Sequence, residues 1–449
     1  MSRGVFRSAW TYIFILLLFA AAQIAHRTPP VRHDSFFFDF SNVYSASRAW
    51  LNGQNPYNIN DVYTAWAGSN HGRYLGTDDP AGMRTWAAVY PPSSLLMIAP
   101  FAALSAVPGH ILWVATSNAL LIATFIALFS LAGIHDRLSR ILLIACALAS
   151  APLQCAMESG QLALPSCALI ILAVFAFSKD RQILAGILLG VATAMKVQVG
   201  APFILYYLFI RQWRVATLAA ILFAVATMAT IARMESIGIS TWSADWHRNV
   251  AMTLDLGQIN DPRPGGPFRN DMVNLQTLLD VVIHRQLDIN FCVVLLYMPL
   301  LVGFLSHVRP GRAAGTDLLA LSLVAALSML PIYRRLYDSV LLLMLLAWAI
   351  ARLRTNERAI GIAVLALLGE FLVPIDLVPF ILRRTHAFDS IISSPWWQGV
   401  IVPHHAWGLL VATVGASYIF NHRTRPAAAP RAQVETPHHS AVTASPHSA

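Results

Sequence analysis

The sequence predicts an all-α polytopic membrane protein. Of its 449 residues, 57% are hydrophobic and only 12% are charged, and the mean hydropathy is +0.58. The apolar residues also gather in long runs separated by short polar connections. A soluble core of this size does not hide so much apolar surface, so the runs are expected to be helices that cross a bilayer.

The apolar runs give twelve expected spans in chain order. A bilayer requires about 20 helical residues, and each run is assigned to one crossing on that basis. The expected spans are residues 9–25, 109–133, 139–156, 161–178, 182–195, 197–210, 215–233, 290–306, 315–331, 336–351, 358–374 and 399–420.

A further apolar stretch, Ser93–Ser105, is too short to cross and is interrupted by Pro100. Proline removes a helical hydrogen bond and clashes with the preceding turn. We therefore expect this stretch to be re-entrant or interfacial.

The positions of lysine and arginine predict the orientation, because short cytoplasmic segments carry the excess of these residues. With twelve spans, the arginines of the N-terminus, of the even-numbered connections and of the C-terminal tail fall on one side. Both termini are then cytoplasmic, and segments 26–108 and 234–289 are long outward loops. Residues 1–421 form one integral membrane domain, and the tail, 422–449, is too poor in apolar residues to fold. The expected location is the cell (inner) membrane.

The remaining composition excludes several classes of function. The net charge of +9 comes from arginines dispersed over the connections, which is an orientation signal and indicates no nucleic-acid partner. The four cysteines lie in or beside apolar runs without metal-ligand spacing.

The first span lacks a small-residue cleavage site and is interpreted as an uncleaved anchor. Glycine-rich phosphate loops and zinc-type histidine motifs are absent, so no cofactor and no metal is expected.

Five residues at the outward boundary are candidates for chemistry. Asp39 follows the first span, where partial desolvation tunes a carboxylate as a proton acceptor within reach of a lipid-borne reactant. Lys196, Arg334 and Arg335 break the positive-inside pattern at helix ends, which favours an anionic lipid phosphate as their partner. Snorkelling of these side chains is the alternative. Asp338 follows at helical i, i+4 spacing from Arg334 and pairs with it or enters the same layer.

Four more polar residues fall in the same layer. Glu158 and Gln161 form a polar turn between two apolar runs. Tyr90 precedes two prolines, which hold it extended, and it either contacts the substrate or anchors at the interface. Tyr337 lies beside Asp338. A loop, an anchor or an ion pair would account for each of these residues singly.

Taken in order, these motifs resemble glycosyltransferase family 87. They are "DFSNVYSASRAWLNGQNPYN" from Asp39, "YPP" at Tyr90, "GQ" opening a span at Gln161, and Lys196 followed by a proline and "RQWR". The resemblance implies the GT-C architecture, in which a multi-spanning enzyme takes a sugar from a polyprenyl monophosphate carrier on the outward face.

The resemblance also implies roles for residues. Asp39 matches the aspartate expected to act as general base in an inverting transfer, and Tyr44 matches the tyrosine of the "Y-x-A" element among the substrate-binding positions. Lys196, Arg334 and Arg335 would hold the phosphate in place of a metal. The implied function is transfer of a hexose, with mannose favoured, to a lipid-linked or envelope glycan acceptor.

Two other classes of function are weighed against this one. A transporter or flippase would move a lipid-linked sugar without chemistry, but transporters often show related halves and polar residues at the midplane. A membrane scaffold has no need of cations on the outward side. The sequence leaves open the donor sugar, the acceptor, the oligomeric state and whether a divalent metal assists.

Overall fold

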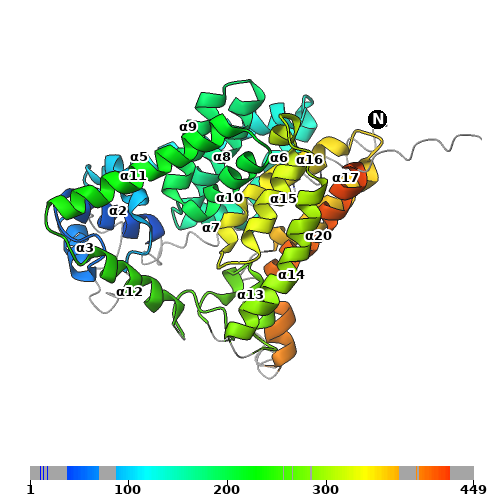
Figure 1. The fold of residues 1–449 in the computed structure, drawn as a ribbon. Helices are drawn as coiled ribbons and strands as arrows, with labels where there is room; N and C mark the ends of the chain where they lie inside the picture. The colour runs from blue at the N-terminus through cyan, green and yellow to red at the C-terminus, as the bar shows by residue number, and fades with distance from the viewer. Residues whose placement is uncertain are drawn as a thin grey trace, which may run out of the picture.

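The computed structural model describes residues 11, 14, 18, 38–69, 87–255, 257–264, 266–283, 286–373, 391 and 394–424. In this part the chain is helical and forms no strand (Figure 1). The α-helices are α2 (Phe38–Leu51), α3 (Ile59–Ala67), α4 (Pro92–Ala102), α5 (Ala106–Leu131), α6 (Arg137–Ala149), α7 (Ala151–Glu158), α8 (Ala163–Ser178), α9 (Gln182–Met195), α10 (Val197–Phe209), α11 (Trp213–Ser236), α12 (Trp242–Leu254), α13 (Leu275–Leu279), α14 (Gln286–His307), α15 (Leu318–Met329), α16 (Leu343–Arg352), α17 (Arg358–Leu368) and α20 (His404–Thr424).

Short helical turns of other types join several of these helices. The 3₁₀ turns are η3 (Arg269–Asp271), η4 (Ala313–Thr316), η5 (Leu336–Leu342) and η6 (Gly369–Leu372), and η7 (Trp397–Ile401) is a π-helix.

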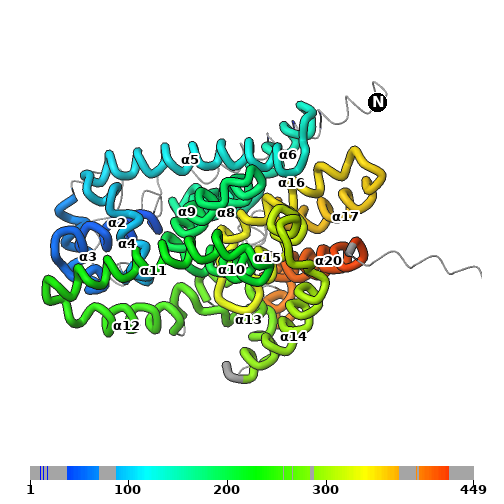
Figure 2. The backbone as a smooth tube through the Cα atoms, turned by 45° about the horizontal axis from the view of Figure 1, so that its top comes forward, coloured from blue at the N-terminus to red at the C-terminus, as the bar shows by residue number. Residues whose placement is uncertain are grey.

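Three helices of the described part are long and apolar enough to cross a membrane alone: α5, α11 and, from Asp288 to His307, α14. Figure 2 shows α5 and α11 as long tubes along the body of the molecule. Apolar side chains on their outer faces, such as Ile122 on α5 and Val225 on α11, are exposed. Exposed apolar faces on helices whose backbone bonds are satisfied internally are what lipid requires. This is a membrane protein.

Other expected spans are broken or short. Span 139–156 is two helices, α6 and α7, bent by 58°. Pro152 causes the break because it cannot bond to the carbonyl of Leu148, and Gln154 Nε2 donates to that carbonyl instead, at 2.8 Å. The apolar helices α8, α9, α10 and α15 have 16 residues or fewer. The membrane character is confirmed, whereas the count of twelve stays a prediction. Most of span 9–25 lies outside the described residues.

The short stretch 93–105 forms α4, which packs on α2 and α11. Its shortness and its internal Pro100 agree with the sequence. Whether it re-enters the membrane stays a prediction.

The two segments expected as outward loops contain helices that pack together. In the first segment, α2 is buried over most of its length. In the second segment, α12 forms hydrogen bonds to the residues that precede α4. Asn249 Nδ2 donates to the Ala88 carbonyl at 3.0 Å, and Trp246 Nε1 donates to the Val89 carbonyl at 3.1 Å. The sequence pattern of these two segments therefore does not predict α2, α3 and α12. Their amphipathic patterns are too short to identify them as helices.

The centre of the described part is formed by α8 and α15, which are buried over nearly their whole lengths. On one side of this centre the segment after Met272 runs against the end of α15. The Val273 amide donates to the Arg334 carbonyl at 3.1 Å, and Met272 forms an isolated bridge with Arg335. This contact holds Arg334 and Arg335 extended before η5 begins.

Candidate active site

The candidate site forms where helices end or break. Asp39 lies in the first turn of α2, Tyr90 stands just before α4, Gln161 separates α7 from α8, and Lys196 separates α9 from α10. The Ser94 hydroxyl donates to the Met195 carbonyl at 2.9 Å, which fastens the start of α4 to the end of α9. Polar side chains gather there because no helix continues through these points.

The break at Lys196 depends on close packing by glycine. Lys196 has φ −149° and ψ 88°, so the helix stops for one residue. A Cβ at Gly200 would lie 2.2 Å from Thr193 Oγ1 and 2.7 Å from Thr193 Cα, a contact that any larger residue would have to relieve. Gly200 thereby allows α10 to start against the last turn of α9, with the Lys196 side chain turned into the protein.

Asp39, Gln161 and Tyr90 form a hydrogen-bonded chain. Gln161 Nε2 donates to Asp39 Oδ2 at 2.9 Å, and the Tyr90 hydroxyl donates to Gln161 Oε1 at 2.8 Å. Because a phenol is a ready donor and the carboxylate is an acceptor, this arrangement determines which way the Gln161 amide points. Tyr90 thus keeps the amide donor, and not the amide oxygen, directed at Asp39.

Burial raises the pKa of the Asp39 carboxyl above its ordinary value of 3.8. The charges of Arg335 and Lys196 act in the opposite direction, as do the hydrogen bonds from Gln161 and Ser159. Burial also raises the pKa of Tyr90 well above its ordinary value, with the charge of Asp39 as a further cause, so Tyr90 stays a proton donor. A carboxylate with a raised pKa is a stronger proton acceptor, which suits a general base.

Lys196, Asp338 and Arg334 form a buried ionic group. Lys196 Nζ lies 2.7 Å from Asp338 Oδ1, and Arg334 Nη1 lies 3.5 Å from Asp338 Oδ2. All three side chains are at most 3% exposed. Arg334 also donates to the Gln198 carbonyl, while its Nε and Nη1 make no hydrogen bond. The i, i+4 pairing expected from sequence is present, but Lys196 is the closer partner.

Arg335 is fixed in a different way. Its Nη2 donates to the Ile259 carbonyl at 2.8 Å and to Asn260 Oδ1 at 3.0 Å, and its Nε donates to the Tyr333 hydroxyl. The guanidinium carbon lies 4.7 Å from the centre of the Phe268 ring. None of these hydrogen-bond partners is a carboxylate, and the charges of Asp39 and Asp271 also act on Arg335.

Sequence reasoning missed Tyr333, Asn260 and Phe268 as partners of Arg335. Burial raises the pKa of Tyr333 to about 12, with the charge of Arg335 opposing the shift. Tyr333 stands two residues before Arg335, and its place in "YRRLY" was the available signal. Asn260 and Phe268 carry no comparable signal, because they approach from segment 234–289, which is distant from Arg335 in the chain.

The structure brings most of the predicted residues together, with one exception. The Tyr337 ring lies under Lys196 Nζ, 4.3 Å from ring centre to nitrogen. Glu158 ends α7 next to Ser159, whose carbonyl accepts from the Phe40 amide at the start of α2. Tyr44, in contrast, lies in the aromatic core of α2, where its hydroxyl donates to the Leu104 carbonyl at 2.7 Å.

The site concentrates charged groups in a largely buried place, where interactions between charges are stronger than in water. Lys196, Arg334 and Arg335 carry three positive charges, whereas Asp39 and Asp338 carry two negative charges when both are ionised. Asp271 is a further carboxylate whose charge acts on Arg335. Around Asp39 the described residues contain no group of three metal ligands; such a group, Glu370 with His404 and His405, is found elsewhere.

A buried carboxylate beside a cluster of cations in an all-helical membrane protein is typical of the functional site of a membrane enzyme. Residues 88–332, more than half of the chain, match glycosyltransferase family 87. The chain belongs to this family, and its activity is that of a glycosyltransferase.

The matched region includes Tyr90, Glu158, Gln161 and Lys196, whereas Asp39 and the "YRRLYD" segment lie outside it. No curated protein and no solved structure matches the chain.

Proposed function

We propose that the protein transfers a hexose, with mannose favoured, from a polyprenyl-phosphate donor to a lipid-linked or envelope glycan acceptor, with inversion and with Asp39 as general base. The observation that carries this proposal is a carboxylate whose pKa is raised by burial, oriented by Gln161 and faced by Arg335 and Lys196. The fold would be of the GT-C type with twelve spans, and the site would face outward across the cell membrane.

The reaction balances with these groups. The acceptor hydroxyl oxygen attacks the anomeric carbon while the bond from that carbon to the phosphate oxygen breaks. The phosphate oxygen keeps the electron pair and leaves as polyprenyl phosphate. Asp39 takes the hydroxyl proton, and the cations stabilise the charge that develops on the leaving group.

Arg335 is best placed to meet the phosphate. Lys196 and Arg334 share Asp338, so their charges are partly compensated, whereas the hydrogen-bond acceptors around Arg335 are neutral. A guanidinium also binds phosphate oxygens in a fork geometry that an ammonium group does not offer. Lys196 and Arg334 would then stabilise the phosphate through the electrostatic potential of their charges more than through direct contact.

An apolar cavity of about 190 Å³ lies beside η5, and we assign it to part of the isoprenoid chain of the donor. Ser339 and Val340, which line the cavity, directly follow Asp338 in η5. The rest of the lining is almost entirely apolar and comes from α6, α7 and the residue between them, from η5, α16, α17 and η6: Leu142, Cys146, Ser150, Pro152, Leu342, Leu343, Leu346, Leu365, Leu368, Gly369, Phe371 and Leu372. If the donor phosphate binds Arg335, this cavity would bury part of its hydrocarbon chain.

Direct transfer of label tests the function. Purified protein in liposomes would be given a radiolabelled polyprenyl-phosphate hexose and a membrane lipid extract. We expect label to move to a new lipid or glycan band with the mannose donor and less with the glucose donor. Label that crosses the bilayer but stays on the donor would support a flippase and contradict the proposal.

Replacement of Arg335 by glutamine should weaken donor binding. Hydrogen bonds to charged groups contribute about 1.5–3 kcal/mol, so the dissociation constant for the donor should rise about 10- to 150-fold. Arg248→Gln is the matched control, because this arginine of α12 is 68% exposed and its partner Asp245 keeps the hydrogen bond from Asn55. Unchanged donor affinity in Arg335→Gln would remove Arg335 from the phosphate site.

Cysteine labelling tests the orientation. In a background without the four native cysteines, an impermeant reagent added outside should modify Ala67→Cys in α3 but not Asn356→Cys between α16 and α17. Both positions are exposed in the structure, so accessibility alone does not separate them. Modification of Asn356→Cys from outside would overturn the proposed topology.

A further inference from the structure

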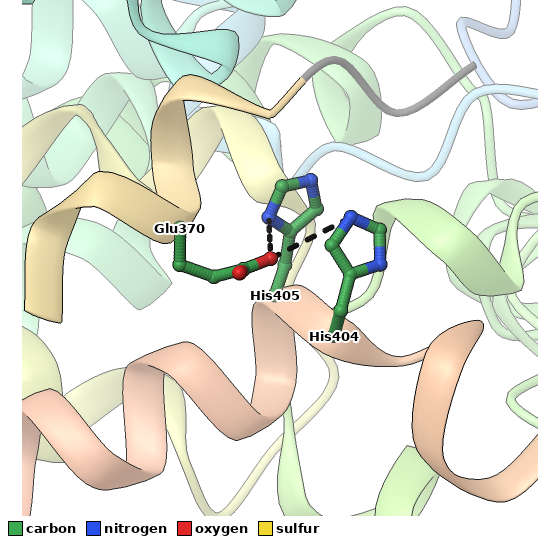
Figure 3. A group of neighbouring side chains, drawn as sticks. All are labelled: Glu370, His404 and His405. Atoms are coloured by element: carbon green, nitrogen blue, oxygen red, sulfur yellow. Dashed lines mark ion pairs between the residues drawn. The ribbon is translucent and has the colours of Figure 1, made fainter. Parts of the chain in front are cut away.

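A second cluster of titratable side chains, Glu370, His404 and His405, lies where α17 and α20 meet (Figure 3). Glu370 belongs to η6 at the end of α17, and the two histidines open α20. One potential ligand atom from each of the three side chains lies within 4.8 Å of the other two. The cluster shares no residue with the candidate active site.

The hydrogen bonds of His404 determine which of its nitrogens is available. Nδ1 lies 2.9 Å from the Ile401 carbonyl and 3.2 Å from the Val402 carbonyl. Carbonyl oxygens only accept, so Nδ1 carries a proton, and the lone pair of the neutral ring is on Nε2. Metal-binding histidines characteristically donate their second ring nitrogen to a carbonyl in this way.

His404 Nε2 and Glu370 Oε1 face each other without a hydrogen bond. They lie 3.6 Å apart, and both atoms are buried and make no hydrogen bond in the described structure. Two acceptors facing each other in a buried place repel unless a cation lies between them. His405 Nδ1 approaches the same carboxylate oxygen at 3.7 Å.

The spacing suits a metal better than a shared proton. An N–H···O bond is about 2.7–3.2 Å long. Ligands at about 2.0–2.2 Å from a tetrahedral zinc ion lie about 3.4 Å apart, close to the two separations seen here. Two imidazole nitrogens and one carboxylate oxygen favour Zn²⁺ or a related transition ion over Ca²⁺ and Mg²⁺, which prefer oxygen ligands.

Gly408 makes this arrangement possible. A Cβ at position 408 would lie 2.6 Å from Glu370 Cγ and 3.1 Å from Glu370 Cβ, so the Glu370 side chain occupies the space that any other residue would fill. Gly408 stands one turn after His404 on α20, on the side that meets η6. His404 and His405 therefore begin α20, and Gly408, one turn later, leaves the space that the Glu370 side chain occupies.

We propose that Glu370, His404 and His405 form a site for a divalent transition metal ion of the zinc class, which fastens the end of α17 to the start of α20. Three protein ligands leave a fourth position for water. The ion would join two segments 34 residues apart in the chain and hold Gly369 and Phe371, on either side of Glu370, in the wall of the apolar cavity.

Zinc binding by the purified protein tests this proposal. The full chain, purified without a histidine tag and stripped with a chelator, would be dialysed against Zn²⁺ and the bound metal measured by elemental analysis. We expect one zinc ion per chain, and more than about tenfold weaker binding in Glu370→Gln and in His404→Gln. Gly408→Ala, which leaves all three ligands in place but displaces Glu370, should also bind more weakly.

The matched control is the double variant His438→Gln and His439→Gln, which removes the adjacent histidine pair of the tail. It should bind zinc as the wild type does. Zn²⁺ should also raise the unfolding temperature of the wild type relative to chelator, because a ligand of the native state stabilises it, and Glu370→Gln should lose this rise. Wild-type zinc affinity in Glu370→Gln, or loss of zinc in the tail variant, would overturn the proposal.

Discussion

Asp39→Asn should bind the donor and transfer almost no sugar. The asparagine is nearly isosteric and keeps an oxygen to accept the hydrogen bond from Gln161 Nε2, but it does not take up the acceptor proton. Removal of a general base typically lowers the rate by about 10²–10⁴. The measurement is the single-turnover transfer rate at saturating labelled donor.

Asp34→Asn is the control, because Asp34 is the nearest other carboxylate in the sequence and lies outside the described residues. It should stay largely active. If Asp39→Asn kept more than about a tenth of the wild-type rate, the loss would be too small for a general base, and Asp39 would have a structural role.

Asp338→Asn should destabilise the protein more than Lys196→Met. The first change leaves Lys196 and Arg334 as two buried cations without a counter-charge, whereas the second leaves the neutral pair of Arg334 and Asp338. Removal of one partner from a buried ion pair costs about 3–5 kcal/mol. We therefore expect a loss of that size in the free energy of unfolding for Asp338→Asn, measured in detergent.

Asp180→Asn is the matched control for this prediction. Asp180 pairs with Arg312 at 3.0 Å, but both side chains are more than half exposed. Exposed pairs contribute at most about 1 kcal/mol, and asparagine tolerates the positive φ of position 180. Equal stability of Asp338→Asn and the wild type would mean that Lys196 and Arg334 are not both charged in the folded protein.

The sequence predicts the helices well where the apolar runs are long. Expected spans 182–195 and 197–210 agree with α9 and α10 to within one residue, because Lys196 interrupts an otherwise continuous run. The 58° bend of span 139–156 was not predicted, since the run stays apolar through Pro152. The sequence pattern does not predict the buried helix α2, because its small polar residues, such as Ser45 and Ser47, are buried through contacts with distant helices.

The sequence predicts which residues form the candidate site but not which of them pair with one another. The positive-inside pattern singles out Lys196, Arg334 and Arg335 as cations at helix ends expected to face outward, and the structure places them with Asp39 and Asp338. Sequence spacing suggested Arg334 as the partner of Asp338, whereas Lys196 is closer because α10 brings it there across more than a hundred residues of chain. The amide of Gln161 and the phenol of Tyr90 are likewise brought together by the fold from positions that are distant in the chain.

The dependence of kcat/KM on pH tests the role of Asp39 most directly. A base acts when deprotonated, so the rate should rise with pH through the pKa of Asp39, which burial places above 3.8. The charge of Arg335 lowers this pKa, so Arg335→Gln should raise it and move the acid limb of the profile to higher pH. An acid limb at the same pH in the wild type and in Arg335→Gln would contradict the assignment of Asp39 as the base.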